Sequence, residues 1–284
     1  MSTNHLISPD SLTRMSEPWV LLDCRPGAET FATGHLPGAI HADLDRTLST
    51  ASDPGFDPAQ GGRHPLPEPC HWSKQLGAWG ITPETYVVAY DAASGGNGAA
   101  RLWWMLRASG HTKVVVLNGG LKAAQEIGLV LTQAPSTPTV APPYPFKSWA
   151  LPQVDLAAVD TLAHDSTWKL LDVRSPERWR GEVEPFDPIP GRIPGSLNLP
   201  WGENLDPTGR FKTPEELREL YQALLDGTPA DHLAVHCGSG VTACHTLLAL
   251  EIAGLPGASI YMGSYSEWCR SGKPLGPERK SVTL

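Results

Sequence analysis

The sequence predicts an α/β fold made of two similar domains, each a parallel β-sheet flanked by helices. Short apolar runs alternate with helical patterns along the chain, as expected for a parallel sheet covered by helices. The second half of the chain also repeats the order of features found in the first half. The length of 284 residues fits about two domains of ~150 residues each.

The repeat begins with a strand that ends in an Asp-x-Arg sequence. Residues 19–25 read Trp-Val-Leu-Leu-Asp-Cys-Arg, and residues 169–174 read Lys-Leu-Leu-Asp-Val-Arg. A related turn follows each of them, Gly-His-Leu-Pro-Gly-Ala-Ile at 34–40 and Gly-Arg-Ile-Pro-Gly-Ser-Leu at 191–197. Two copies of one domain explain this shared order better than coincidence does.

Later elements match in the same order. Each half has two more apolar strands with a helix between them. The expected strands are 86–90, 114–117, 233–236 and 259–262, and the expected helices are 98–109 and 241–253. One further helix has a clear start, because Thr213 is suited to be its N-cap, Pro214 its first residue and Glu216 the partner in a capping box.

A proline-rich segment separates the two halves. Six prolines lie between residues 132 and 152, which excludes a helix interior or a central strand there. Such a segment indicates a semi-rigid extended connector. We therefore expect a first domain over residues 1–135, a linker over 136–152 and a second domain over 153–284.

Composition and charge exclude several classes of protein. A net charge of -8 disfavours binding to nucleic acid or to an anionic membrane, and no apolar run reaches the ~18 residues of a membrane span. Residues 1–10 lack the pattern of a secretory signal. The five cysteines form no Cys-x-x-Cys pair and the ten histidines show no metal-ligand spacing. We therefore expect a cytoplasmic protein with no metal and no cofactor.

The sequence around Cys237 predicts a prepared sulfur nucleophile. Cys237 stands between the strand 233–236 and the helix 241–253, where the carboxyl end of a parallel strand meets a helix N-terminus. Gly238 and Gly240 let the loop curl with its N–H groups pointing inward, and the helix N-terminus adds about half a positive charge. Both effects stabilise a thiolate and lower the pKa of the thiol from its usual ~8.5. A reactive cysteine is therefore favoured over one that only packs.

With this loop in view, the chain resembles the tandem-domain rhodanese family of sulfurtransferases over almost its whole length. The stretches that carry the resemblance are 34–39, 101–107, 117–120, 171–174 and 263–268. The active-site loop, Cys237-Gly238-Ser239-Gly240-Val241-Thr242, resembles the branch that uses 3-mercaptopyruvate. The resemblance implies two rhodanese-like domains, of which the first is catalytically silent. Asp91 holds the nucleophile position there, and a carboxylate cannot carry a transferable sulfur.

The chemistry implied by the resemblance is a double displacement through Cys237. The Cys237 thiolate takes the sulfur of 3-mercaptopyruvate, pyruvate leaves, and a persulfide remains on the enzyme. An acceptor such as cyanide, a small thiol or thioredoxin then removes the outer sulfur.

The resemblance also implies residues that assist the nucleophile. The Ser239 hydroxyl is expected to donate a hydrogen bond to the thiolate or to relay a proton. Asp45 and His64, both from the first domain, complete this arrangement. The active site would then lie between the two domains.

Arginines are implied as the binding site for the anionic donor. Arg178 matches the family's donor-binding arginine, and Arg180 lies close to it in the sequence. A guanidinium holds a carboxylate by a fork of two hydrogen bonds. The branch often has a second arginine a few residues further on, which this shorter segment lacks. Arg192 replaces the histidine that is usual in the following turn, and whether it supplies the second cation stays open.

The same residues bear on three alternative functions. Thiosulfate as the main donor favours several cations near the cysteine; the uncharged loop argues against it, whereas Arg178, Arg180 and Arg192 leave room for it. A non-catalytic sulfur carrier or interaction module would be expected to lose the nucleophile, which is present here. A cysteine-based phosphatase is excluded, because its loop needs an arginine where this chain has Ala243.

The remaining cysteines and the tryptophans are expected to be structural. Cys24 and Cys244 are expected in the core, and the ten tryptophans in core and interface packing. Cys269 is expected in a partly exposed loop, where a redox role stays open.

Overall fold

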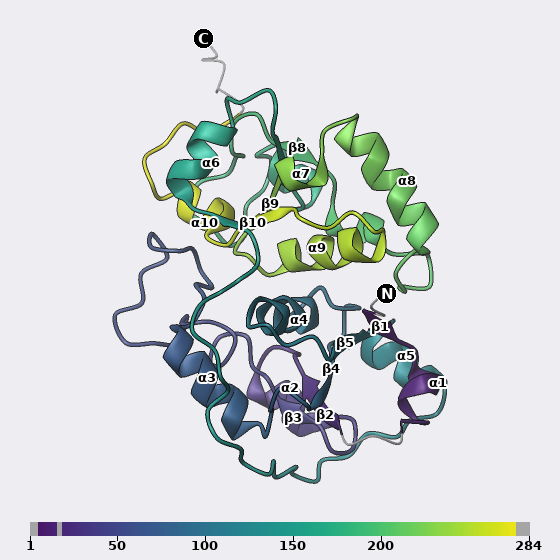
Figure 1. Cartoon of the computed structure of the whole chain (residues 1–284). Helices are drawn as coiled ribbons and strands as arrows, with labels where there is room; N and C mark the ends of the chain where they lie inside the picture. Colours follow the sequence, from purple (N-terminus) through teal and green to yellow (C-terminus); the bar gives the residue numbers. More distant parts are fainter. Residues whose placement is uncertain (1–4, 16–18, 277–284) are drawn as a thin grey trace.

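A computed structural model describes residues 5–15 and 19–276, and it contains two five-stranded sheets, one in each half of the chain (Figure 1). All strand pairs within both sheets are parallel. The first sheet has the order β1 (Leu6–Ile7), β5 (Val114–Leu117), β4 (Tyr86–Tyr90), β2 (Trp19–Asp23), β3 (Ile40–His41). The second has the order β6 (Gln153–Val154), β10 (Ser259–Tyr261), β9 (Leu233–His236), β7 (Lys169–Asp172), β8 (Leu197–Asn198). The α/β fold with two repeated parallel sheets is thereby confirmed.

Helices flank both sheets. In the first half they are α1 (Pro9–Leu12), α2 (Ala28–Thr33), α3 (Pro69–Ala78), α4 (Ala99–Ala108) and α5 (Gly120–Glu126). In the second half they are α6 (Leu156–Leu162), α7 (Pro176–Trp179), α8 (Pro214–Leu225), α9 (Thr242–Ile252) and α10 (Ser264–Trp268), with short 3₁₀ turns at Trp201–Asn204 and Ala230–His232. The predicted helices α4 and α9 are confirmed. The predicted start of α8 is confirmed as well, because Thr213 and Glu216 form both hydrogen bonds of a capping box.

The repeat extends to buried side chains. Arg25 donates a fork of hydrogen bonds to Asp23 and a further bond to the carbonyl of Gly34 at 2.6 Å. Arg174 makes the same fork to Asp172 and reaches the carbonyl of Gly191 at 2.8 Å. Because all four charged side chains are buried, each arginine is paired where it would otherwise be costly. The Asp-x-Arg sequences thus tie the end of an interior strand, β2 or β7, to the following turn in both halves.

The two halves meet along α4 and α9, which lie side by side between the sheets (Figure 1). Residues from Ala243 to Leu250 of α9 are all buried, as expected of a helix that is apolar on every side. One hydrophobic cluster includes Trp103 and Trp104 of α4 and Leu247 and Leu250 of α9. The predicted interface role of the tryptophans is confirmed for this pair.

The proline-rich connector has no helix or strand from residue 133 to 152. It is nevertheless held to the first half by backbone hydrogen bonds, from Ala141 to Gly77 and from Ala150 to Ala108. Figure 1 shows it running along the outside of the lower half before it enters the upper half at α6. Of the N-terminal segment 1–10, residues 1–4 lie outside the described residues. None of the helices in the described part of the chain is long and apolar enough to cross a membrane.

Candidate active site

Cys237 is the first residue after β9 and lies just before α9. It is only 2% exposed. Burial by itself raises the pKa of this thiol, but hydrogen bonds from the Thr242 hydroxyl, from the backbone N–H groups of Ser239 and Ala243 and from the Ser264 hydroxyl outweigh burial, so the pKa lies below its ordinary value. A buried sulfur whose thiolate is stabilised by hydrogen bonds is suited to nucleophilic attack.

The loop around Cys237 is shaped by Gly240 and Ser264. Gly240 has a φ of +73°, and a Cβ atom there would lie 2.5 Å from the carbonyl oxygen of Met262, so only glycine fits. The Ser264 hydroxyl accepts hydrogen bonds from the N–H groups of Cys237 at 3.2 Å and Gly240 at 3.0 Å. Val241 and Thr242 then lead into α9. Sequence reasoning missed Ser264, although it lies in one of the stretches that carry the family resemblance.

Ser239, His64 and Asp45 lie in one hydrogen-bonded row. His64 Nδ1 lies 2.7 Å from Ser239 Oγ, and His64 Nε2 lies 3.1 Å from Asp45 Oδ1. Burial, together with the positive charges of Arg101 and Arg63, lowers the pKa of His64 to about 3, so its ring is neutral. Because a carboxylate only accepts hydrogen bonds, Nε2 carries the proton and Nδ1 accepts from the Ser239 hydroxyl. The three predicted residues therefore meet, and the row can carry a proton away from Ser239.

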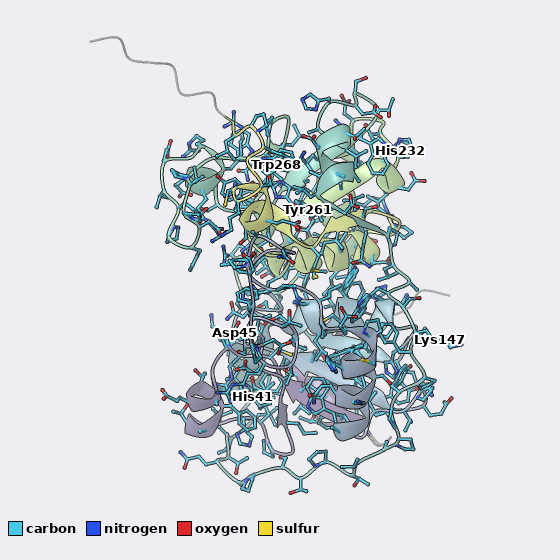
Figure 2. The ribbon with its side chains drawn as sticks, turned by 90° about the vertical axis from the view of Figure 1, so that its left-hand side faces the viewer. His41, Asp45, Lys147, His232, Tyr261 and Trp268 are labelled. Carbon is cyan, nitrogen blue, oxygen red and sulfur yellow. The ribbon has the colours of Figure 1, made fainter. Side chains whose placement is uncertain are left out.

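Asp45 is the most exposed member of this row, with 60% of its side chain accessible. Its pKa is raised, first by partial burial and then by the neighbouring charge of Asp43. Figure 2 shows Asp45 in the part of the lower half that faces the upper half. The first half thus supplies Asp45 and His64, while the second supplies the loop of Cys237.

Close backbone packing brings the His64 segment onto the Cys237 loop. A Cβ atom on Gly62, which has a φ of +79°, would lie 2.3 Å from the carbonyl oxygen of Gly263. The N–H group of Gly61 donates to a carboxylate oxygen of Glu267 at 2.9 Å. These contacts fix a loop of the first half against the residues that shape the loop of the second.

Arg101 of α4 forms hydrogen bonds with both the His64 segment and the Cys237 loop. It is fully buried, and it donates to the carbonyl oxygens of His64 at 2.8 Å, Leu48 at 3.0 Å and Gly240 at 3.3 Å. Burial lowers the pKa of Arg101 to about 10, which leaves it charged at neutral pH. Sequence reasoning did not identify Arg101, although it begins the stretch 101–107 that carries part of the resemblance.

The predicted donor-binding arginines are not all placed alike. Arg178 donates two hydrogen bonds to Glu184, at 3.1 and 2.7 Å, and its Nη2 would lie 3.2 Å from a Cβ atom on Gly238. Arg180 pairs with Glu182 on the exposed surface. Arg192 lies over the ring of Trp179, with its Cζ atom 4.2 Å from the ring centroid. Within residues 5–15 and 19–276, only Arg178 of these three contacts the Cys237 loop.

A second arginine, which sequence reasoning missed, lies beside the loop. Arg63 donates from Nη2 to Ser239 Oγ at 3.4 Å and forms an ion pair with Asp187 through Nη1. Asp187 also accepts from Arg270 at 2.7 Å. Although burial raises the pKa of Asp187, the bonds from Arg63 and Arg270 hold it below its ordinary value. Nothing in the sequence indicated that Arg63, the neighbour of His64, would contact the other half of the chain.

The loop of the first half holds a carboxylate where the second holds a thiol. Asp91 follows β4 as Cys237 follows β9. Its two carboxylate oxygens accept hydrogen bonds from the N–H groups of Ala93, Gly95, Asn97, Gly98 and Ala99 at 2.8–3.0 Å. The Asp91 side chain thus occupies the centre of its own loop as a fixed anion.

The other cysteines lie mostly in the core. Cys24 and Cys244 are buried, as predicted. The prediction that Cys269 is partly exposed is wrong, because Cys269 packs against Tyr265 and Trp268 and is only 5% exposed. Burial raises the pKa of its thiol, which disfavours oxidation at this position.

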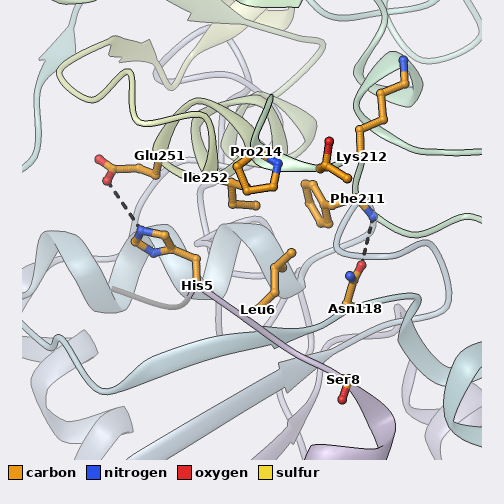
Figure 3. A pocket seen from close by; sticks show the side chains of 10 residues that line it. His5, Leu6, Ser8, Asn118, Phe211, Lys212, Pro214, Glu251 and Ile252 are labelled. Atoms are coloured by element: carbon orange, nitrogen blue, oxygen red, sulfur yellow. Dashed lines mark hydrogen bonds and ion pairs between the residues drawn. The ribbon is translucent and has the colours of Figure 1, made fainter. Parts of the chain in front are cut away.

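A cleft lies elsewhere along the junction of the two halves. It has a volume of about 430 Å³ and is lined by residues of β1 and the start of α8, among them His5, Leu6, Lys212 and Pro214 (Figure 3). None of its lining residues belongs to the Cys237 loop, so its size does not identify the site of chemistry. Among the residues that the structure describes, no group of three His, Cys, Asp or Glu side chains could hold a metal ion.

Comparison with known proteins agrees with this geometry. The model of the rhodanese-like domain family matches residues 8–126 and 155–271. The chain is 42% identical over 280 residues to the "Probable 3-mercaptopyruvate sulfurtransferase" of Pseudomonas aeruginosa, covering 94% of this chain and 96% of that protein. It is 35% identical to the "Putative thiosulfate sulfurtransferase SseB" of Mycobacterium tuberculosis, covering 94% and 92%.

Solved structures show the same fold. The 3-mercaptopyruvate sulfurtransferase from Leishmania major superimposes with a TM-score of 0.82 at 28% sequence identity. The superposition covers 96% of this chain and 76% of that one. The similarity therefore includes both sheets and the junction between them.

Proposed function

The chain belongs to the rhodanese-like family of sulfurtransferases, and on that premise we propose that it moves a sulfane sulfur from 3-mercaptopyruvate, through a persulfide on Cys237, to a thiophilic acceptor. The observation that carries the proposal is the buried Cys237 thiol with a lowered pKa beside the Ser239–His64–Asp45 row. An uncharged loop with a hydroxyl relay suits a donor that must lose a proton. The names of the Pseudomonas aeruginosa and Leishmania major relatives support the same donor.

In the first step the Cys237 thiolate attacks the sulfur of 3-mercaptopyruvate. A sulfur–sulfur bond forms, the carbon–sulfur bond of the donor breaks, and its electron pair leaves with pyruvate as the enolate. The enolate carbon then takes the proton that the donor thiol carried, which yields pyruvate and a deprotonated Cys237 persulfide. Ser239 and His64 can relay that proton along their hydrogen bond, because the low pKa of His64 makes it release the proton again readily to the enolate. Asp45 stabilises the charge that His64 carries during the transfer.

In the second step an acceptor removes the outer sulfur. A cyanide ion or a thiolate forms a bond to that sulfur, the sulfur–sulfur bond breaks, and Cys237 leaves as the thiolate with which the cycle began. The lowered pKa of Cys237 makes it a good leaving group as well as a nucleophile. Small thiols and thioredoxin are the acceptors we propose, in the cytoplasm.

The remaining predicted residues take supporting roles in this proposal. Gly238, Gly240, Val241 and Thr242 shape the loop around the sulfur, and Arg178 binds the donor's carboxylate. We assign no donor contact to Arg180 or Arg192. Because Asp91 holds the nucleophile position of the first half, we propose that this half is catalytically silent and that the protein has one active site. We also propose two domains, with limits near residues 135 and 153.

Thiosulfate is the second candidate donor. Two guanidinium groups, of Arg63 and Arg178, approach the Cys237 loop, and a compact dianion benefits from several cations. The name of the Mycobacterium tuberculosis relative supports the same donor. The uncharged side chains of the loop favour 3-mercaptopyruvate.

The deciding experiment measures sulfur transfer to cyanide with each donor, in the wild-type protein and in Cys237→Ser. We expect a far larger kcat/KM with 3-mercaptopyruvate and no transfer in Cys237→Ser. A larger kcat/KM with thiosulfate would assign that donor instead. If neither donor is used and Cys237 titrates as an ordinary thiol, a sulfur-carrier or interaction module replaces the catalytic proposal.

A further inference from the structure

Two guanidinium groups, one from each half of the chain, converge on Gly238 beside the nucleophile. A Cβ atom on Gly238 would lie 3.1 Å from Arg63 Nη2 and 3.2 Å from Arg178 Nη2. Both arginines also face the exposed ring of Phe186, with Cζ atoms 5.3 and 5.0 Å from its centroid. The two cations therefore share one small region next to Cys237.

The carboxylates in this region do not neutralise the two arginines equally. Arg178 and Arg174 both form ion pairs with Glu184. Arg174 also pairs with Asp172, so these two arginines have two carboxylates between them. Arg63 and Arg270 instead share the single carboxylate of Asp187. One positive charge is thus left over on the Arg63 side.

Among the described residues, the other ionisable groups near Arg63 form no ion pair with it. His64 is neutral, since its pKa is about 3, and Arg101 adds a buried positive charge nearby. Asp45 is directed to His64, and Glu267 to the N–H group of Gly61. Arg63 therefore shares its ion-pair partner Asp187 with Arg270, and its Nη2 atom faces Ser239 and Gly238 of the Cys237 loop instead of a carboxylate.

We infer that Arg63 is a specificity-determining residue, which binds the donor's carboxylate together with Arg178. This inference rests on the proposed function and deepens it. Arg63 supplies the second cation, the role that the sequence left open for Arg192. Because Arg63 and Arg178 come from different halves, donor binding would depend on how the halves are docked. A guanidinium on each side of a carboxylate satisfies both of its oxygens.

The test compares two donors, of which one has the carboxylate and the other lacks it. 3-Mercaptopyruvate carries a carboxylate where 1-mercaptopropan-2-one has a methyl group, and both have the same thiol and ketone. We expect Arg63→Met to raise KM for 3-mercaptopyruvate and to lower the ratio of its kcat/KM to that of the neutral donor by about 10- to 100-fold. The neutral donor should lose only what the contact of Arg63 with Ser239 contributes, and that loss should be in kcat. Arg63→Lys should lie between the two, and Arg14→Met, an exposed arginine remote from the loop, should match the wild type.

A binding measurement keeps the test independent of turnover. Pyruvate should protect Cys237 from alkylation by iodoacetamide, and Arg63→Met should require a higher pyruvate concentration for half-protection. If the wild type does not use 3-mercaptopyruvate but this shift is seen, the donor proposal fails and the role of Arg63 in carboxylate binding stands. The inference about Arg63 is overturned if both donors lose activity equally, if neither does, or if pyruvate protects the variant and the wild type alike. Thermal unfolding shows whether each variant is folded.

Discussion

At the scale of single residues, the ionisation of Cys237 is decided between burial and hydrogen bonding. Burial opposes a thiolate, whereas two hydroxyl groups and two backbone N–H groups favour it and outweigh burial. A hydrogen bond to a charged group contributes about 1.5–3 kcal/mol. Losing one such donor should therefore be enough to bring the pKa back towards its ordinary value.

Thr242→Val should raise the pKa of Cys237 by about one unit, because it removes the hydroxyl donor and keeps the side-chain volume. The thiolate would then form at a higher pH, and the rate of alkylation at pH 7 would fall. The measurement is the pH dependence of iodoacetamide labelling, followed on the peptide that contains Cys237. Thr246→Val, the same change one turn along α9, serves as the control. An unchanged pKa in Thr242→Val would contradict the role assigned to this hydroxyl.

Ser239 and His64 should behave as one unit. Proton transfer through a positioned pair contributes about 10²- to 10⁴-fold to a rate. We expect Ser239→Ala and His64→Asn each to lower kcat with 3-mercaptopyruvate by about that factor, and the double variant to be little worse than either single one. Single-turnover rates of persulfide formation provide the measurement. Additive losses would mean that the two residues act separately, against the relay drawn from their 2.7 Å contact.

At the scale of elements, the sequence predicted the structure correctly where the residues that determine it are adjacent in the chain. The strand, the two glycines and the helix around Cys237 are contiguous, so the placement of Cys237 followed from known strand–loop–helix geometry. The capping box of Thr213 and Glu216 was equally local. The exposure of Cys269 was predicted wrongly, because tertiary packing against Trp268, and not its loop position, decides its burial.

Residues that reach the site from distant segments were the ones missed. Arg63 bonds to Ser239 over a separation of 176 positions, and Arg101 to Gly240 over 139. No periodicity or spacing in a single sequence encodes how two halves dock. His64 and Asp45 were found only because the family resemblance supplied that information.

Arg101 of α4 should act as a positioning residue for both sides of the site. Its guanidinium donates to the carbonyl groups of His64 and Gly240, one on each side of the site. Arg101→Met should lower the free energy of unfolding by about 1–3 kcal/mol and reduce kcat more than it changes KM. Arg101→Lys should recover part of the activity, and Arg107→Met on the same helix should behave like the wild type. Urea unfolding and steady-state kinetics give the two readouts. Loss of stability with unchanged kcat in the folded protein would reduce Arg101 to a purely structural role.

At the scale of the whole molecule, the same fold occurs twice, but the two copies hold different side chains at the centre of the corresponding loop. The two sheets have the same strand order, and both carry a loop whose N–H groups gather around an anionic centre. In the first half the Asp91 side chain occupies that centre, whereas in the second half the centre is the Cys237 sulfur. In the proposed mechanism the first half still contributes to the chemistry, since His64, Asp45 and Arg63 all belong to it.

The docking of the halves should make the protein sensitive to mild acid. His245 of α9 is fully buried, donates from Nε2 to the carbonyl of Ser94 in the other half at 3.2 Å, and accepts from Asn204 at Nδ1. Burial lowers the pKa of His245 to about 3, and that of His64 is also about 3. In the unfolded chain both titrate near ~6.5.

Between pH 6.5 and 3 the unfolded state therefore binds more protons than the folded state, so stability is fully present above about pH 6.5 and is lost as the pH falls. Each of the two histidines should remove up to about 1.4 kcal/mol of unfolding free energy per pH unit in this window. Urea unfolding at pH 7, 6 and 5, above the range in which carboxylates titrate, measures the slope. His245→Gln should flatten it, whereas His164→Gln, at an exposed histidine, should leave it unchanged. A stability that does not change between pH 7 and 5 would show that the junction does not hold these histidines neutral. It would also contradict the proposal that His64 enters the reaction as a neutral proton acceptor.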